Sequence, residues 1–342
     1  MPDSVVNLYS DTQTRPSAAM RRAMAEAEVG DEQRGHDPEV NALQEEVAEL
    51  LGKEAALFLP SGSMCNQIAI RIHIRPLGDE MYAHRLAHVI NAEAAGAAAI
   101  SGALTMSLEG EGGTFDADAL RARMRDPLDS HEPRSRLVTV EQPTNLGGGR
   151  VWPMAKIEEV LAVATEFGLR THMDGARLPN AVVASGVSAA AFAAGFETAW
   201  IDFSKGLGAP IGACLAGSAE LIEEARRYKQ MLGGSMRQAG IVAAGARYGL
   251  QHNVERLVED HANAKFLAQG LAEIDGVEID PAAVETNIVI FDVADAVGLH
   301  DRLAAAGVEM SLLEGRVRAV THLDVDRAGV EKALAAVRDA LS

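Results

Sequence analysis

The chain has 342 residues, of which 48% are hydrophobic and 23% are charged, so it can bury one large core or two smaller ones. Its 49 acidic residues outnumber 31 basic residues, and the net charge of −18 argues against nucleic acid and anionic membranes as partners. The two cysteines form no disulfide framework, and we find neither a secretory signal nor an apolar stretch of about 18 residues. We therefore expect a cytoplasmic protein.

The first two thirds of the chain alternates between helical periodicity and short apolar runs. The range 37–52 carries apolar residues at helical spacing from Val40 to Leu50 and ends at Gly52, which suits the position after a helix. On such patterns, helices are predicted over 37–52, 154–168 and 183–194, and strands over 55–60, 135–143, 169–177 and 198–204.

Strands and helices that alternate with short connections imply parallel strand pairing. In such α/β sheets, ligands bind beyond the carboxyl ends of the strands. Three predicted strands end near chemically distinctive residues, namely Glu141, Asp174 and Lys205. The sequence thus predicts an α/β fold, with a mostly parallel sheet between helices and a polar site at one edge of it.

The pattern changes near residue 250. A long amphipathic helix is predicted over 251–274, followed by elements that make a small α+β unit. Its strands are predicted over 286–293 and 315–323, and its helices over 296–307 and 327–342.

Three local motifs each allow a structural and a chemical interpretation. The Ser-Gly-Ser turn at 61–63 is either an ordinary turn or a phosphate site at a helix N-terminus. Asp174 and Arg177 form either a helix cap with a salt bridge, or a carboxylate that keeps a ring nitrogen protonated beside an arginine. Lys205 either extends to solvent or is a Schiff-base lysine, whose pKa burial would depress.

The order of these motifs resembles that of pyridoxal-phosphate enzymes of the aspartate aminotransferase fold, fold type I. Over nearly its whole length, the chain resembles the threonine aldolase and β-eliminating lyase family. The resemblance rests on the segments 10–16, 35–67, 172–181, 204–212, 233–240 and 318–324. It implies a large domain, 31–250, that binds pyridoxal phosphate, and a small C-terminal domain, 251–342, with which an N-terminal segment, 1–30, packs.

The resemblance also implies a role for each residue that matches a family motif. Lys205 would bind pyridoxal 5′-phosphate covalently as an aldimine, and Asp174 would pair with its ring nitrogen. Further cofactor contacts would come from Gly62, Ser63, Met64, His88, Glu141, Arg177 and, from a neighbouring subunit, Arg237. Ser10, Arg177 and Arg318 would bind the substrate carboxylate, because an arginine fork pairs with both oxygens.

The implied reaction is the retro-aldol cleavage of a β-hydroxy-α-amino acid, of the L-threonine or L-allo-threonine type, to glycine and an aldehyde. His88, His131 and a bound water are the candidate bases for the β-hydroxyl proton, and the sequence does not choose among them. Thr12 and Thr14 match positions near a monovalent or divalent cation in some relatives. The family further implies a homo-oligomer, commonly a tetramer built from dimers.

Four places depart from the family pattern. Tyr9 stands where arginine is common, Arg34 where tyrosine is usual, and Ala92 where an aromatic residue is usual. The range 142–145 reads Gln-Pro-Thr-Asn instead of Asn-Thr-His-Asn, so that one histidine is missing. These changes concern the identity of the substrate more than the use of the cofactor.

Two other hypotheses stay open at this stage. A β-eliminating lyase of the same fold would release a leaving group from the β-carbon of another amino acid. A non-catalytic, metal-binding protein would use the His-x-Asp pairs at 172–174 and 322–324, because residues i and i+2 of a strand share a face. The presence of Lys205, Asp174 and Arg177 argues against the loss of catalysis.

Overall fold

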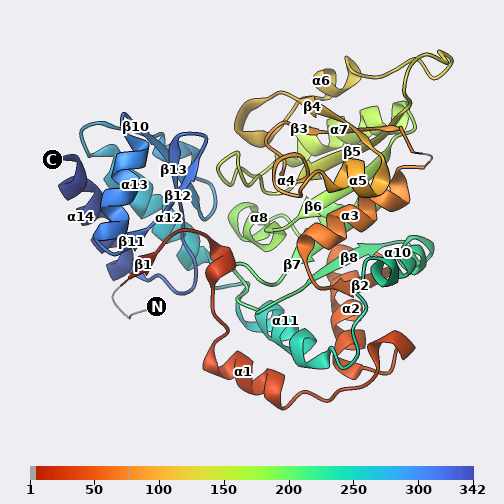
Figure 1. Cartoon of the computed structure of the whole chain (residues 1–342), viewed down its shortest axis with the longest axis horizontal. Helices are drawn as coiled ribbons and strands as arrows, with labels where there is room; N and C mark the ends of the chain where they lie inside the picture. The colour runs from red at the N-terminus through yellow and green to blue at the C-terminus, as the bar shows by residue number, and fades with distance from the viewer. Residues whose placement is uncertain (1–4, 76) are drawn as a thin grey trace.

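The computed structural model describes residues 5–75 and 77–342. They form a larger body built on a seven-stranded sheet and a smaller body that carries the C-terminus (Figure 1). The described chain begins at the smaller body with β1 (Val6–Asn7) and reaches the larger one through η1 (Asp11–Gln13) and α1 (Ala18–Ala25) (Figure 1).

The large sheet has the strand order β2-β8-β7-β6-β5-β3-β4. Every neighbouring pair is parallel except the two that involve β8, which runs against the other six strands. The strands are β2 (Ala55–Leu59), β3 (Glu80–His84), β4 (Leu104–Leu108), β5 (Ser135–Glu141), β6 (Arg170–Gly175), β7 (Thr198–Asp202) and β8 (Ala213–Gly217). The predicted mostly parallel sheet is confirmed.

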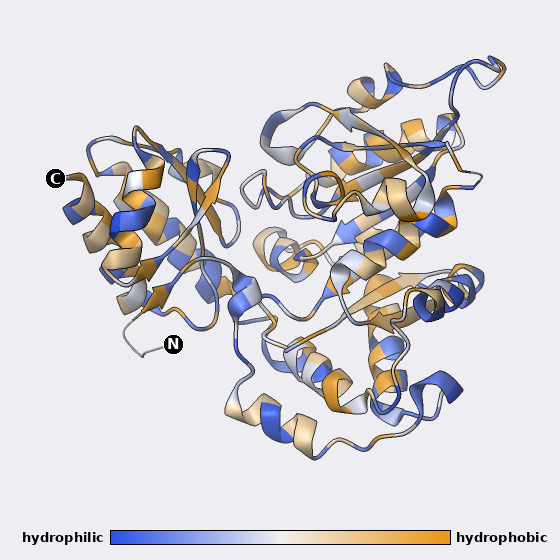
Figure 2. Ribbon diagram, viewed as in Figure 1, coloured by the Kyte–Doolittle hydropathy of each residue, from blue (hydrophilic) through white to orange (hydrophobic). Residues whose placement is uncertain are grey.

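Helices cover both faces of this sheet. In β2, Leu57 and Leu59 pack with α3 and α10, whereas Ala56 and Phe58 pack with α2 and α9, as the alternation of side chains along a strand requires. α10 is largely hydrophilic, as expected of a surface helix, and lies beside the hydrophobic strands β2 and β8 (Figure 2). The helices are α2 (Pro38–Leu51), α3 (Gly62–His73), α4 (His88–Asn91), α5 (Gly96–Ser101), α6 (Ala117–Arg121), α7 (Met154–Glu166), α8 (Leu178–Ser185), α9 (Ala189–Ala193), α10 (Ala219–Met231) and α11 (Gly240–His252), with short 3-10 turns η2 (Glu32–Arg34) and η3 (Glu111–Gly113).

The smaller body has its own hydrophobic core, to which Val6 and Leu8 of the N-terminal segment belong. Its antiparallel sheet has the order β12-β13-β10-β9, and β1 pairs in parallel with β11. The elements are α12 (Leu257–Ala272), β9 (Val277–Glu278), η4 (Pro281–Ala283), β10 (Ile288–Val293), α13 (Ala296–Ala305), β11 (Val308–Glu309), β12 (Ser311–Leu313), β13 (Arg316–Val320) and α14 (Arg327–Leu341). The domain limits at residues 30 and 250 stay a prediction.

Two predicted helices are wrong in extent. The helix predicted over 251–274 is interrupted between α11 and α12, where the Asn253 side chain donates to the carbonyl of Leu207 at 2.8 Å. The Ala-rich helix predicted over 183–194 is two helices, because Gly186 ends α8 in a left-handed conformation and Ser188 caps α9. Within the described ranges, no helix is long and apolar enough to cross a membrane.

A buried carboxylate, Asp37, ties three segments of the larger body together. One oxygen caps α2 by accepting from the N–H of Val40 at 3.2 Å. The other accepts from the N–H groups of Gly30 and Gly240, at 3.2 and 2.8 Å, and so holds the chain before η2 against the start of α11. Because Asp37 is fully buried, water cannot replace these bonds.

We predict that Asp37→Ala lowers the free energy of unfolding by about 2–4 kcal/mol, since it removes a helix cap and leaves buried N–H groups without an acceptor. Asp295→Ala, which removes the exposed cap of α13, should cost only about 1 kcal/mol. Urea unfolding monitored by circular dichroism measures both. Equal losses for the two variants would contradict the prediction.

Candidate active site

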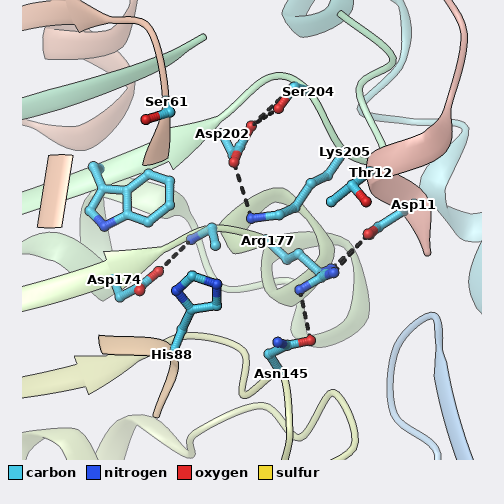
Figure 3. Close-up of polar contacts among 12 residues, drawn as sticks. Asp11, Thr12, Ser61, His88, Asn145, Asp174, Arg177, Asp202, Ser204 and Lys205 are labelled. Carbon is cyan, nitrogen blue, oxygen red and sulfur yellow. Dashed lines mark hydrogen bonds and ion pairs between the residues drawn. The ribbon is translucent and has the colours of Figure 1, made fainter. Parts of the chain in front are cut away.

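A pocket of about 580 Å³ opens at the carboxyl ends of β5, β6 and β7. Glu141 ends β5, Asp174 precedes the last residue of β6, and Lys205 follows β7 by three residues. All three side chains line the pocket, because neighbouring parallel strands end at the same edge of the sheet. Figure 3 shows the polar side chains that meet there.

Lys205 is held in the turn after β7 by contacts on two sides. Its Nζ lies 3.0 Å from Oδ2 of Asp202, the last residue of the strand. Oδ1 of Asp202 accepts from the backbone N–H and the hydroxyl of Ser204, which fixes the carboxylate (Figure 3). The carbonyl of Lys205 accepts from the hydroxyl of Thr14 at 2.8 Å. The amine therefore has a defined position in the pocket.

The N-terminus of α3 borders the same pocket. Ser61 caps the helix by accepting from the N–H of Met64, and Ser61, Gly62 and Ser63 all line the pocket. Only glycine fits at position 62, because a Cβ there would lie 2.2 Å from the indole ring of Trp200. The positive end of a helix dipole, free of a side chain at its first residue, favours a phosphate group.

The carboxylate of Asp174 is buried and fixed from two directions. Oδ1 accepts from the backbone N–H of Ala176 at 3.1 Å, and Oδ2 accepts from Nδ2 of Asn66 at 2.7 Å. The ring of His88 lies next to Asp174, and both residues line the pocket (Figure 3). The carboxylate is thus placed to pair with a protonated ring nitrogen.

Arg177 is paired with a carboxylate that the sequence did not indicate. Its Nε and Nη2 donate to the two oxygens of Asp11, both at 2.7 Å, and both side chains are buried. Burial alone would raise the pKa of Asp11, but the Arg177 guanidinium outweighs it and holds that pKa well below its usual range. Asn287, in the smaller body, donates to the same carboxylate at 3.1 Å.

Arg318 has unused donors, in contrast to Arg177. Its Nη2 donates to Oδ1 of Asn145 at 2.8 Å, and this oxygen also accepts from Nη1 of Arg177 at 3.3 Å. Its Nε is buried and has no hydrogen-bond partner within residues 5–75 and 77–342. Burial and the charge of Arg177 lower the pKa of Arg318 to about 10. An incoming carboxylate would satisfy both the charge and the Nε donor.

Two ionisable groups in the pocket have shifted pKa values. Burial and the neighbouring Asp174 raise the pKa of Glu141 to about 7, although the N–H groups of His88 and Asn145 donate to it. Burial lowers the pKa of His88, but a hydrogen bond to Glu93 and the surrounding carboxylates outweigh this effect and raise it. Shifts of this kind are typical of functional sites.

Three of the predicted catalytic and cofactor-binding residues do not line the pocket of their own chain, and neither does Thr14, one of the two residues predicted near a cation. His131 lies in the loop between α6 and β5, and 93% of its side chain is exposed. The Arg237 side chain is 65% exposed and donates to Asp31. Met64 lies on the first turn of α3 and packs against Gly234. Their predicted roles stay predictions.

Ser10, Thr12 and Thr14 come from the N-terminal segment. Ser10 and Thr12 line the pocket, and Oγ1 of Thr12 donates to Oγ of Ser10 at 2.9 Å. Thr14 uses its hydroxyl on Lys205, as described above. In the part of the chain that the structure describes, no three His, Cys, Asp or Glu side chains form a metal-binding group. The cation expected near Thr12 and Thr14 stays a prediction.

The residues fit pyridoxal phosphate on three counts. Lys205 presents an amine, Asp174 a fixed carboxylate, and α3 an N-terminus kept clear by Gly62. For the substrate, Arg318 adds a buried donor that has no partner among the described residues and suits the carboxylate of an amino acid. The four groups surround one pocket.

The comparisons with known proteins agree with this geometry. Residues 7–296 match the model of the family described as β-eliminating lyase. Low-specificity L-threonine aldolase 1 from Arabidopsis thaliana is 38% identical over 98% of this chain and 96% of its own length. The threonine aldolase of Leishmania major has a similar structure, with a TM-score of 0.83 at 18% identity, over 98% of this chain and 99% of that one. The aspartate aminotransferase of Rhizobium meliloti has a TM-score of 0.70 at 16% identity, over 98% and 91% of the two chains.

The chain belongs to the β-eliminating lyase family. Its fold is the type I fold of enzymes that depend on pyridoxal phosphate, as the resemblance implied. Family members of this kind are lyases, and the predicted enzyme class is confirmed.

The departures from the β-eliminating lyase pattern fall into two groups. Tyr9 and Ala92 line the pocket, so they can affect the choice of substrate. Arg34 lies outside the pocket of its own chain. Gln142 pairs with the backbone of Trp152, and Thr144 donates to the carbonyl of Gly112, so both are used in holding loops together.

Sequence reasoning missed four residues of the site: Asp11, Glu93, Asn145 and Asp202. Asp202 could have been found, because it lies three residues before Lys205 at the end of a predicted strand. Glu93 could also have been found, because it follows His88 by five positions. Asp11 and Asn145 meet their partners through contacts that no local pattern indicates, such as Asp11 with Arg177, 166 positions apart.

We predict that Asp11→Asn lowers the free energy of unfolding at pH 7 by about 3–5 kcal/mol, because Arg177 would be left as an unpaired buried charge. The folded-state pKa of Asp11 is depressed, so the ion pair stabilises the protein above about pH 4 and is lost as the pH falls further. The difference between wild type and variant should therefore shrink in acid.

Urea unfolding at pH 7 and at pH 3–4 measures this difference. Asp118→Asn is the control, because Asp118 pairs with Arg121 on the surface and is 94% exposed. A difference between wild type and Asp11→Asn that is the same at both pH values would contradict the prediction.

Proposed function

We propose that this protein is a pyridoxal-phosphate-dependent aldolase that cleaves a β-hydroxy-α-amino acid, of the L-threonine or L-allo-threonine type, to glycine and an aldehyde. The observation that carries the proposal is the meeting of Lys205, Asp174 and Arg318 in one pocket of a β-eliminating lyase fold. The relatives named as low-specificity L-threonine aldolases support the reaction type.

In this proposal, the residues that hold the cofactor are those that line the pocket. Lys205 would hold it covalently through Nζ, Asp174 would face its ring nitrogen, and Gly62 and Ser63 would face its phosphate. When bound, pyridoxal phosphate acts as an electron sink for a carbanion at Cα of the substrate. The ring of His88 borders the same space.

The substrate carboxylate would bind to Arg318, with Ser10 beside it. The Nε of Arg318 has no partner in the described part of the chain, whereas two nitrogens of Arg177 are engaged by Asp11. We therefore assign Arg177 mainly to holding Asn145 and Asp11 in place, and Arg318 to binding the carboxylate. A fixed carboxylate orients the Cα–Cβ bond that breaks.

His88 is the base that this chain presents to the substrate. It lines the pocket, whereas His131 is exposed outside it. His88 would accept the β-hydroxyl proton, directly or through a water. The hydrogen bond to Glu93 and the neighbouring carboxylates raise the pKa of His88, which makes the ring a stronger base.

We also propose that the protein acts as a homo-oligomer, a dimer of dimers. Arg237 supports this assembly, because it is exposed and lies outside the pocket of its own chain, so it is available to a neighbouring phosphate site. The cytoplasmic location stays a prediction.

Product analysis tests the reaction type. We predict that the enzyme incubated with L-threonine forms glycine and acetaldehyde in equal amounts, and that Lys205→Ala lowers the rate about 1,000-fold or more. Lys229→Ala, which removes another buried lysine, should keep activity wherever the variant folds. Formation of a 2-oxo acid and ammonia instead would show the alternative reaction, β-elimination, and overturn the aldolase assignment.

A second prediction concerns carboxylate binding. Arg318→Gln should raise KM for L-threonine about 10–100-fold, since it removes a charge-assisted contact to the substrate. Arg316→Gln is the matched control, because Arg316 lies on the same strand but pairs with Asp292 at the surface. Steady-state kinetics measure both variants. The same KM in both would contradict the role of Arg318.

A further inference from the structure

Nδ1 of His88 is hydrogen-bonded to Glu93, a residue that does not line the pocket. Nδ1 lies 2.8 Å from Oε1 of Glu93, while the ring borders the pocket and 34% of the side chain is exposed (Figure 3 shows the ring). Which atom carries the proton in this contact decides whether His88 can act as a base.

Glu93 is surrounded by donors. Only 1% of its side chain is exposed, and Oε1 also accepts from Nδ2 of Asn66 at 2.7 Å. Oε2 accepts from Nε2 of Gln67 at 2.5 Å. Asn66 and Gln67 each donate to this carboxyl group, and an ionised carboxylate only accepts, so we assign Nδ1 of His88 as the donor.

The orientation of the Asn66 amide is fixed independently by Trp200. The indole nitrogen of Trp200 can only donate, and it lies 2.7 Å from Oδ1 of Asn66. Nε2 of His172 lies 3.0 Å from the same oxygen. Nδ2 of Asn66 therefore faces Glu93 and Asp174, to which it donates one hydrogen each. In this chain of hydrogen bonds, Trp200 donates to Asn66, and Asn66 donates to the carboxylates of Glu93 and Asp174.

The backbone after Glu93 adopts a costly conformation. Ala94 and Ala95 have φ values of 51° and 58°, in the left-handed region that non-glycine residues rarely occupy. Gly96 then begins α5 so close to Gln67 that a Cβ would lie 2.6 Å from its amide. Such strain persists where the surrounding contacts determine the geometry, and the side chain of Glu93, next to the strained pair, makes three hydrogen bonds.

We propose that Glu93 is a positioning residue for catalysis: it holds the proton on Nδ1 of His88 and so presents Nε2 of His88 as the acceptor of the substrate β-hydroxyl proton. This inference rests on the proposed aldolase function. The proton passes from the hydroxyl oxygen to Nε2, the O–H electron pair forms the aldehyde C=O, and the Cα–Cβ electron pair stays with the glycine fragment. That fragment takes up a proton before release, so the proton count balances.

Several charged groups besides Glu93 lie around His88 and also affect its pKa. Glu93, Glu141 and Asp174 face it from the α4–α5 connection, β5 and β6. The cations Lys205 and Arg177 line the same pocket. Because the Glu93 carboxylate is hydrogen-bonded to the ring, its neutralisation must lower the pH at which His88 gains a proton.

The test uses the full-length holoenzyme with Glu93→Gln. We expect the titration midpoint of His88, followed by NMR of histidine-labelled protein, to fall by about one pH unit. We expect the acid limb of the kcat/KM profile to move with it, and kcat to fall about 100-fold. Glu93→Asp keeps the charge and should retain a midpoint near that of wild type. An unchanged midpoint and acid limb in Glu93→Gln would overturn the proposal.

Two controls separate positioning from general damage. Glu80→Gln neutralises another fully buried carboxylate, at the far end of β3, where it pairs with Arg125 and Tyr82. An equal shift of the His88 midpoint in this variant would overturn the proposal. In a His88→Asn background, Glu93→Gln should cost less than about threefold in kcat, because the two residues act as a unit.

Failure of this inference is distinguishable from failure of the proposed function. The titration of His88 requires no turnover. A 2-oxo acid product would overturn the aldolase assignment, and with it the β-hydroxyl as the proton donor. An unchanged titration in Glu93→Gln would overturn the role of Glu93 even if the product were glycine.

Discussion

The ion pair between Asp11 and Arg177 is the interaction on which the rest of the site depends. Arg177 starts α8 at the edge of the large sheet, and a guanidinium buried there needs a carboxylate. The N-terminal segment supplies that carboxylate, and Asn287 of the smaller body donates to it as well. One buried charge thus joins the N-terminal segment, the large sheet and the smaller body around the pocket.

The ion pair with Asp11 gives Arg177 a structural role and leaves Arg318 to bind a ligand. Because Asp11 engages two nitrogens of Arg177, Arg318 is left with a buried donor that has no partner in the described structure. The side chain of Asn145 accepts from both guanidinium groups, and its backbone N–H donates to Glu141. An amino acid carboxylate entering the pocket therefore meets one available arginine, and this sets its orientation.

The opposite wall of the pocket depends on hydrogen bonds with a defined direction. Trp200 fixes the amide of Asn66, and Asn66 donates to both Asp174 and Glu93. As a result, the carboxylate that would face a ring nitrogen and the carboxylate that orients His88 share one donor. Fixing both through a single buried amide makes the site rigid before any ligand binds, which lowers the reorganisation needed for reaction.

Much of this arrangement was predictable because it follows from strand order. Glu141, Asp174 and Lys205 meet since parallel strands end at one edge, and a helix follows the turn at 61–63 as expected. The break at Asn253 was not predictable, because the hydrophobic periodicity continues across it and a distant carbonyl decides it. The pairing of Asp11 with Arg177 and the exposed position of His131 likewise depend on tertiary contacts and loop paths, which leave no local pattern.

The central claim is that Lys205, at the end of β7, is the residue that holds the cofactor. The most direct measurement is borohydride reduction of the protein with pyridoxal phosphate, followed by proteolysis and mass spectrometry. Lys229 is the internal comparison, since it is also buried but its Nζ pairs with Glu32 away from the pocket. We predict one phosphopyridoxyl group per chain, on Lys205. Modification of Lys229 in its place, or no modification of Lys205, would contradict the account.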